Sequence, residues 1–174
     1  IRLFDLAPGN REDPLQGSFR SVSLNSQPNF DALSYLWGDS EDKFSIFIGM
    51  EKRHELLARN NLVAALTDLR SREATVTLWV DALCIDQNDK SGKSYQIPMM
   101  ALIYTTARTV RAWIDVKVDP QAQAFEDLLQ LGKGVELENK DAEFWYPGAD
   151  IFRSPYWSRL WVQQELILAR RLVV

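Results

Sequence analysis

Residues 75–85 read TVTLWVDALCI, and this stretch decides the fold because it is nearly all apolar and rich in β-forming residues. Such a run predicts a strand that is buried on both faces, as in the parallel sheets of α/β proteins. A polar loop from Asp86 to Ser94 follows, and beyond it apolar residues recur at helical spacing. Pro98 is expected in the first turn of this helix, where proline is tolerated. The helical stripe consists of Ile97, Met100, Ala101, Tyr104 and Arg108.

Segments on either side of this run alternate between strand and helix patterns. Phe30 to Trp37 is a compact apolar strand that ends at the turn signal Gly38-Asp39-Ser40. Asn60 can cap a helix, because Leu62, Leu66 and Leu69 follow it at helical spacing. This alternation predicts a mainly parallel sheet covered by helices on both faces. Further elements are expected as a strand over Thr109–Ile114, a helix over Ala122–Leu131, a loop over Gly132–Lys140, an irregular segment or short helix over Asp141–Phe152, and a final strand from Leu172.

Two pairs of short segments predict antiparallel structure instead. Ile1 to Leu6 and Phe19 to Leu24 are partly alternating apolar segments around a polar loop, and we expect them to form a small antiparallel add-on. Lys43 to Ile48 and Arg53 to Leu57 flank Gly49-Met50-Glu51, which is typical of a hairpin.

The composition is that of one ordinary globular domain. The 174 residues are enough to bury a core, and the net charge of −4 gives no general attraction to nucleic acid or anionic membranes. No apolar run of about 18 residues exists that could span a bilayer. A single cysteine, Cys84, rules out an internal disulfide and fits a reducing, cytoplasmic setting. Because the chain starts at Ile1 rather than Met, residues 1–174 are expected to be a piece of a longer protein.

Several common catalytic and binding motifs are absent or incomplete. Gly92-Lys93-Ser94 lies in the right context for a phosphate loop, but the glycine that the motif needs five residues earlier is Gln87. The lone histidine, His54, lies in the expected hairpin, so a hydrolase built on it is the weaker alternative to a surface histidine. Cys84 is expected in the core, and one histidine with one cysteine makes a zinc site improbable.

The segment from Ser154 to Ala169 predicts one helix, with Ser154 as its N-cap and Pro155 at its first position. Glu165 projects from the apolar side of this helix, where a carboxylate is costly unless paired and its pKa is open to tuning. Glu165 is therefore a candidate for catalysis, and the alternative is a structural bond to Arg159, Arg111 or a backbone amide. The apolar arc comprises Trp157, Leu160, Trp161, Val162, Leu166, Ile167, Leu168 and Ala169, and the polar stripe comprises Arg159, Gln163 and Arg170.

The carboxyl ends of the predicted parallel strands form a second candidate region. Ligands of open α/β sheets bind at this edge, near the point where the strand order reverses. For Asp81, Asp86 and Asp89, turn formation and capping remain an equal alternative to a role facing a ligand. One or two tryptophans at this edge could stack on a planar ring. The residues placed here are Tyr35, Trp37, Gly38, Asp39, Asp81, Asp86 and Gln87.

Three motifs resemble the signature blocks of the fungal heterokaryon incompatibility (HET) domain, in order and in spacing. They are ALSYLWGD (residues 32–39), LWVDALCIDQND (78–89, followed by Gln96, Ile97, Met100, Ile103, Tyr104 and Ala107) and SRLWVQQEL (158–166). The resemblance covers nearly the whole chain. It departs from the family where Gly92 replaces a common acidic residue, and Pro98 is also unusual. The resemblance implies an effector domain of programmed cell death after fusion of unlike hyphae, regulated by other domains of a larger receptor.

The HET family is in turn similar to TIR domains, which implies a TIR-like or flavodoxin-like sheet. The pattern Trp161-x-x-x-Glu165-Leu166 resembles the TIR helix with the catalytic glutamate, so the implied reaction is cleavage of the N-glycosidic bond of NAD⁺ without metal or other cofactor. Sites of this type are often completed by a second subunit, which implies self-association. The alternative is a non-enzymatic signalling or self-assembly module. The implied site has Glu165 as catalytic residue and Tyr35, Trp37, Gly38, Asp39, Asp81, Asp86, Gln87, Trp161 and Arg159 as substrate-binding residues.

Overall fold

The computed structural model describes residues 1–38, 41–49, 54–87, 90–116 and 150–174, with the backbone alone for residues 90–97. The chain divides into two compact units, one formed by Ile1–Trp113 with Leu160–Val174 and the other by Ile114–Arg159. The helix and loop expected over residues 122–140, and the segment 141–149, lie outside the described residues. Within the described ranges, no helix is both long and apolar enough to span a membrane.

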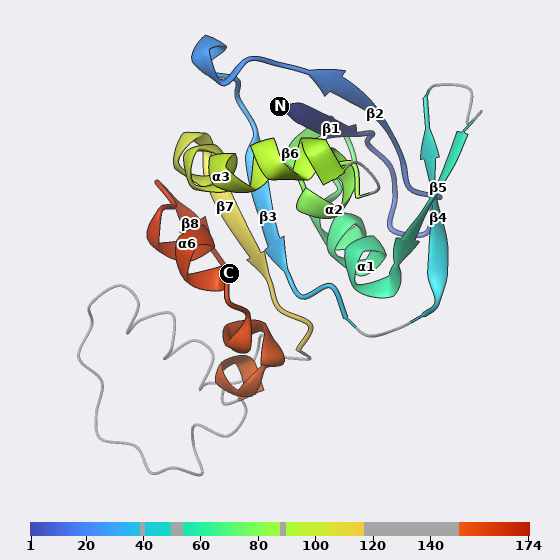
Figure 1. Ribbon diagram of the computed structural model, residues 1–174. Helices are drawn as coiled ribbons and strands as arrows, with labels where there is room; N and C mark the ends of the chain where they lie inside the picture. The colour runs from blue at the N-terminus through green and yellow to red at the C-terminus, as the bar shows by residue number, and fades with distance from the viewer. Residues whose placement is uncertain (39–40, 50–53, 88–89, 117–149) are drawn as a thin grey trace. The chain divides into compact units, whose positions relative to one another are not determined.

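The first unit is built on an eight-stranded sheet with the strand order β5-β4-β2-β1-β6-β3-β7-β8 (Figure 1). Its strands are β1 (Arg2–Leu6), β2 (Gln16–Ser21), β3 (Asp31–Tyr35), β4 (Lys43–Ile48), β5 (His54–Arg59), β6 (Val76–Trp79), β7 (Thr109–Trp113) and β8 (Leu172–Val173). The predicted strands at β3, β7 and β8 and the predicted β4–β5 hairpin are confirmed.

Four neighbouring strands, β6, β3, β7 and β8, are mutually parallel. Numbered by their appearance along the chain, they run second, first, third and fourth across the sheet. The remaining pairs mix both directions, because β1 is antiparallel to β2 and β6, β4 is antiparallel to β5, and β2 is parallel to β4. The expectation of a mainly parallel sheet is therefore met only in part: the fold is α/β with a mixed sheet.

The N-terminal strand pair is antiparallel as predicted, but β2 covers Gln16–Ser21 and not Phe19–Leu24, and the pair is not an add-on. β1 forms hydrogen-bonded ladders on both of its edges, with β2 on one side and β6 on the other. Its apolar side chains Leu3, Phe4 and Leu6 are fully buried. The alternation of these short segments correctly predicts strands, but it carries no information on which neighbour each strand joins.

The predicted strand over residues 75–85 is wrong in its second half. Only Val76–Trp79 form β6, and the chain then turns into the short helix α2 (Asp81–Cys84). Asp81 supports this turn, because its Oδ1 accepts a hydrogen bond of 2.7 Å from the Ala82 amide. Leu83 and Cys84 are still buried in the helix, so the apolar pattern continues although the strand has ended.

Residues 154–169 do not form one continuous helix. Ser154 is the predicted N-cap and accepts a hydrogen bond of 3.3 Å from the Tyr156 amide, but the element that it caps is the short 3₁₀-helix η2 (Pro155–Ser158). Arg159 is extended, and the α-helix α6 begins only at Val162 and ends at Ile167. The expected apolar arc is also broken, since Leu160 is 82% and Ile167 is 78% exposed.

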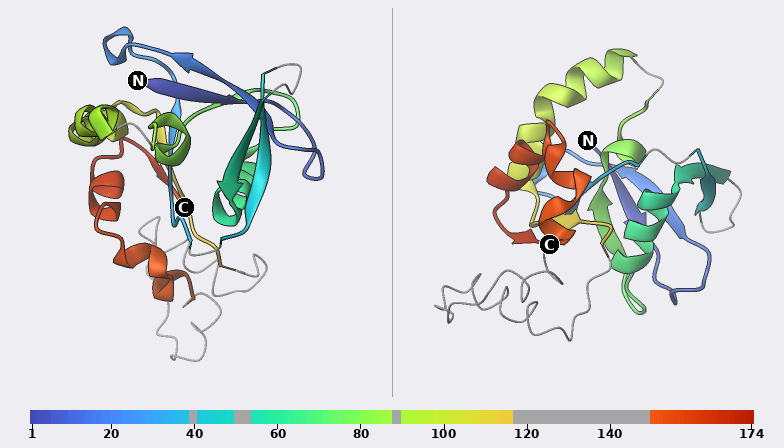
Figure 2. Two further views of the ribbon diagram at one scale, coloured as in Figure 1. Left: turned by 45° about the vertical axis from the view of Figure 1, so that its right-hand side comes forward. Right: turned by 90° about the horizontal axis from the view of Figure 1, so that it is seen from below.

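Two other helix ends differ from the predictions. Helix α1 (Asn60–Leu69) has Arg59 at its N-cap position, so Asn60 is the first helical residue and not the cap. Helix α3 (Lys90–Thr106) begins inside the predicted loop, which places Pro98 in the helix interior and not in the first turn. A short 3₁₀-helix, η1 (Leu24–Ser26), precedes β3. Helix α1 contacts β3, β4 and β5, while α6 contacts β7 and lies beside α3 (Figure 2).

A buried ion-pair cluster closes the amino end of β3. Asp31 is fully buried, and its two oxygens accept hydrogen bonds from Arg108 Nε at 2.9 Å and Arg111 Nε at 2.7 Å. The hydrogen bond and the negative charge of Asp31 raise the pKa of the Arg108 guanidinium. Both oxygens of this carboxylate are thus satisfied, as a buried charge requires. No sequence pattern singled out Asp31.

Candidate functional site

Glu165 is held at the carboxyl end of β3. It lies in the first turn of α6 with only 1% of its surface exposed, and the hydroxyl of Ser34, fully buried in β3, donates a hydrogen bond to Glu165 Oε2. The predicted burial of Glu165 is confirmed. The hydroxyl partner was not among the partners expected for a structural role, and Arg111, which was, pairs with Asp31. The first and third sequence motifs therefore meet through one buried hydrogen bond.

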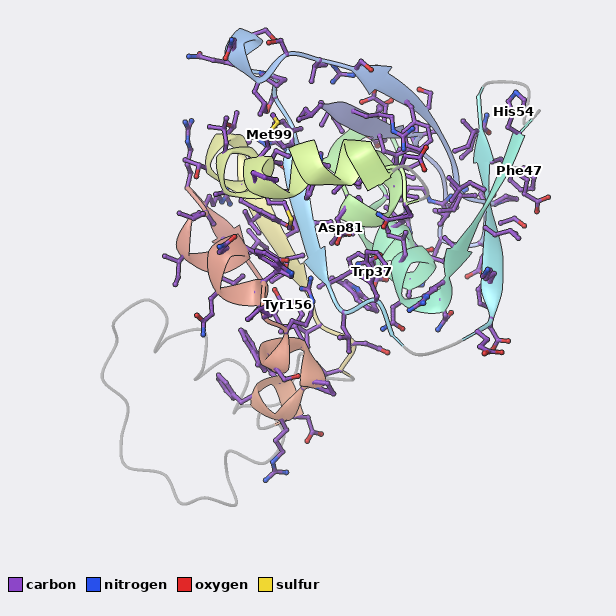
Figure 3. All side chains as sticks on the ribbon, in the orientation of Figure 1. Trp37, Phe47, His54, Asp81, Met99 and Tyr156 are labelled. Carbon is purple, nitrogen blue, oxygen red and sulfur yellow. The ribbon has the colours of Figure 1, made fainter. Side chains whose placement is uncertain are left out.

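The first and second motifs meet through Trp37 and Asp81. The indole Nε1 of Trp37 donates to both carboxylate oxygens of Asp81, at 3.2 and 3.1 Å (Figure 3). Asp81 is the first residue of α2, so this contact ties the segment after β3 to the segment after β6. Because β3 and β6 are parallel neighbours, both segments leave the same edge of the sheet. The predicted juxtaposition of Trp37 and Asp81 is confirmed.

Two side chains near the start of α1 hold the segment that follows β3. Asn61 Nδ2 donates to the Leu36 carbonyl at 3.0 Å, and Arg59 Nη1 donates to the Gly38 carbonyl at 2.6 Å. Gly38 has a φ of +73°, and a Cβ there would lie 3.0 Å from Asn61 Nδ2. A glycine is needed at this position, since a side chain would be strained and crowded. The guanidinium carbon of Arg59 lies 6.0 Å from the centroid of the Trp37 ring, within range of a cation–π contact.

The other predicted site residues are distributed unevenly. Gln87 is exposed and its Nε2 donates to the Asp81 carbonyl at 3.2 Å, whereas Asp86 is exposed to solvent. Tyr35 is only 2% exposed and Trp161, just before α6, is 41% exposed. Two candidates are not placed with the rest: Asp39 lies outside the described residues, and Arg159 belongs to the second compact unit, where its guanidinium carbon lies 5.6 Å from the Tyr156 ring centroid.

The supporting roles of Ser34, Arg59 and Asn61 were not predicted from the sequence, for different reasons. Ser34 lies inside the first motif, so the motif itself marked it, although nothing in the sequence joined it to Glu165. Arg59 and Asn61 act through contacts to backbone carbonyls, and such contacts leave no pattern in a sequence. Trp37, Gly38, Asp81 and Gln87 are linked to one another or to shared supporting residues, so most of the predicted region forms one corner of the molecule.

The structure excludes the alternative that the chain is a hydrolase that uses His54. His54 is exposed at the start of β5, in the hairpin and away from Trp37 and Asp81 (Figure 3). Cys84 is 1% exposed, and burial raises the pKa of its thiol to about 12, so it is a neutral core residue. Across the described ranges, no group of three or more histidine, cysteine, aspartate or glutamate residues could hold a metal ion.

Comparison with known proteins shows the family of this chain. The family model for "Heterokaryon incompatibility protein (HET)" matches residues 30–165, a range that contains Ser34, Asp81 and Glu165. Over 144 residues the chain is 31% identical to the Neurospora crassa protein named "Heterokaryon incompatibility protein 6, OR allele". The aligned region is 76% of this chain but 21% of that relative, so the chain spans about a fifth of the relative's length. No solved structure matches.

Proposed function

The chain belongs to the heterokaryon incompatibility (HET) family, and we propose that it is a fungal cell-death effector that cleaves the N-glycosidic bond of NAD⁺ as TIR domains do. Glu165 is the proposed catalytic carboxylate. The proposal extends to self-association, as in TIR-type sites, and to control by other domains of a longer protein; the relative, of which the aligned region is 21%, is long enough to hold such domains.

The position of Glu165 against Ser34 is the observation that carries this proposal. The strand order second-first-third-fourth across β6, β3, β7 and β8 agrees with the first four strands of the flavodoxin-like order 2-1-3-4-5, whose switch point lies between its first and third strands, although the sheet here continues beyond β6 into antiparallel β1. Here those strands are β3 and β7, and Ser34 is paired in register with Ala112 of β7. Glu165 therefore reaches the sheet at the point where ligands of doubly wound folds bind. This strand order also supports the TIR-like part of the proposal.

The chemistry asks little of the protein beyond one well-placed carboxylate. The bond between ribose C1′ and the nicotinamide nitrogen breaks, and its electron pair stays with the ring, which leaves as a neutral molecule. Water then adds to the oxocarbenium-like ribose and releases a proton. A carboxylate beside the ribose stabilises the developing positive charge and can hold a ribose hydroxyl. Trp37 offers a partly exposed indole, anchored by Asp81, on which a planar ring can stack.

Burial of Glu165 imposes one condition on this mechanism. Its carboxylate faces the Ser34 hydroxyl and is almost without contact with solvent. For a ribose hydroxyl to reach the carboxylate, a group that now surrounds Glu165 must give way, or α6 must shift as substrate binds. Helix α6 is only six residues long, but Val162 within it is buried and Leu168 and Ala169 after it pack against the core, so a shift of α6 would have to break these contacts.

NAD⁺ consumption by the purified chain tests the proposal, with the chain fused to a domain that clusters it because TIR-type sites are often shared between subunits. Glu165→Gln should abolish turnover, whereas Glu73→Gln, an exposed glutamate in a loop, should leave it unchanged. Circular dichroism and thermal melting establish that each variant is folded. The enzymatic proposal is wrong if the clustered chain, folded and at high concentration, consumes no NAD⁺.

A non-enzymatic assembly module is the second candidate, and a different observation favours it. Leu160, Trp161 and Ile167 are 82%, 41% and 78% exposed on either side of the buried Glu165. A contiguous exposed apolar patch marks a surface that a partner covers, and in this second proposal the three side chains form such a patch. In that case Glu165→Gln lowers stability without any NAD⁺ turnover to lose, and Ile167→Asp abolishes self-association measured by light scattering.

A further inference from the structure

A polar cavity lies at the amino ends of the parallel strands, away from Glu165. It has a volume of about 390 Å³ and is formed by three turns, which lead into β3, β7 and β8 respectively. This volume falls within the range of about 300–1,000 Å³ that is usual for small-molecule sites. The lining residues are Gln27, Pro28, Asn29, Thr106, Arg108 and Arg170.

The charge at this cavity is positive and only partly compensated. Arg108 Nε is bound to Asp31, which also pairs with Arg111, so one carboxylate is shared by two guanidinium groups. Arg170, on the turn that leads into β8, also lines the cavity and adds another positive charge. In the part of the chain that the structure describes, neither Arg170 nor the terminal nitrogens of Arg108 have a hydrogen-bond or ion-pair partner.

The cavity also presents neutral hydrogen-bonding groups. Gln27, Asn29 and Thr106 line it, and among the described residues their side chains have no hydrogen-bond partner either. Gln27 has a φ of +50°, a left-handed conformation that is uncommon for a residue other than glycine. The bond to Asp31 orients Arg108 before any ligand arrives, which lowers the entropy that binding would cost. Two guanidinium groups, two amides and a hydroxyl thus line one cavity with few internal partners.

We propose that this cavity binds the phosphate group of a small phosphorylated molecule. A phosphate offers several acceptor oxygens, which matches the excess of donors, and guanidinium groups bind phosphate in bidentate geometry. A carboxylate offers only two oxygens and leaves more of these donors unpaired. The cavity is larger than one phosphate group, so there is room for the rest of a small molecule.

Isothermal titration of the chain at physiological salt with pyrophosphate, ADP and adenosine tests the proposal. Pyrophosphate and ADP should bind with a stoichiometry of one, and adenosine should not. Equal affinity for pyrophosphate and ADP means that free phosphate groups are the ligand, whereas tighter binding of ADP means that the cavity also holds the nucleoside. Absence of saturable binding of both phosphate compounds overturns the proposal.

Matched variants locate the binding. Arg170→Ala should weaken binding at least about tenfold, because it removes a charge-assisted hydrogen bond. Arg171→Ala is the control, since Arg171 is an exposed neighbour that does not line the cavity. Equal losses in both variants mean non-specific attraction and overturn the proposal. Glu165→Gln should bind ADP as tightly as the parent chain does, so this proposal can hold whether or not the chain cleaves NAD⁺. If Trp37→Ala loses ADP binding and Arg170→Ala does not, ADP binds outside this cavity and the proposal is overturned.

Discussion

Replacement of Asp31 by asparagine should destabilise the chain by about 2–3 kcal/mol, close to the value of one charge-assisted hydrogen bond. The side chain of Asp31 is fully buried, and each of its oxygens accepts one hydrogen bond from an arginine. Asparagine has the same shape, so no cavity forms. Its carbonyl can still accept from one guanidinium, but its amide group must face the other, donor against donor.

The exposure of the two arginines sets the size of this loss. Removing one partner of a fully buried ion pair costs about 3–5 kcal/mol, because a charge is left without compensation. The Arg108 and Arg111 side chains are 58% and 33% exposed, so water can solvate the charges that remain. The cost should therefore fall below that range, yet stay a large fraction of the roughly 5–15 kcal/mol by which domains are stable.

Urea denaturation followed by far-ultraviolet circular dichroism measures this loss as a lower midpoint at unchanged slope. Arg11→Ala is the control, since the Arg11–Asp68 pair is on the surface and should contribute at most about 1 kcal/mol. A loss below about 0.5 kcal/mol for Asp31→Asn would be that of an ordinary surface substitution and would refute the reasoning. A change in slope would mean that the variant alters the compactness of the native or unfolded state.

Three further predictions concern the site and the core. Gly38→Ala should destabilise the chain by about 1–2 kcal/mol because its backbone is left-handed, and by a further steric cost. Gly49→Ala is the control, because Gly49 has a φ of +87° with open space around it and should show no steric cost in parallel urea titrations. Trp37→Phe should cost about 1 kcal/mol by removing the donor to Asp81, and in a double-variant cycle with Asp81→Asn the losses should not add. At pH 8, iodoacetamide should modify Cys84 only after unfolding, and rapid labelling of the native chain would contradict its burial. Because burial raises the pKa of the Cys84 thiol from 9.0 to about 12, its contribution to stability is constant below pH 9 and falls as the pH rises from 9 to 12.

Local signals in the sequence predicted local structure well. The cap at Ser154, the β4–β5 hairpin and the strand of the first motif follow from residue types within a few positions of one another. The failure over residues 75–85 has a physical cause, because a strand and a short helix that are both buried give the same apolar run. The broken helix after Ser154 failed for a related reason: apolar residues at helical spacing do not exclude an extended residue such as Arg159 between two helices.

Long-range contacts were accessible only where a motif marked them. The helical spacing placed Glu165 on a buried face, and the structure confirms this, but its partner Ser34 lies 131 residues away. The placement of Trp37 and Asp81 at one edge of the sheet was expected from the rule that parallel strands end together, but the hydrogen bond between them was not. No motif or topological rule predicted the ion pairs of Asp31, whose two arginine partners lie 77 and 80 residues away in the sequence.

The position of β1 bears on how the domain should be delimited. The family match starts at residue 30, yet β1 and β2 form two of the interior strands of the sheet. In a chain trimmed to start at residue 30, β6 would lose β1, one of its two neighbours, and the amide and carbonyl groups on that edge would be unpaired. Open edges of this kind template intermolecular pairing. Loss of the first 29 residues is therefore expected to promote aggregation, and the structural boundary of the domain lies upstream of residue 30, where the family match starts.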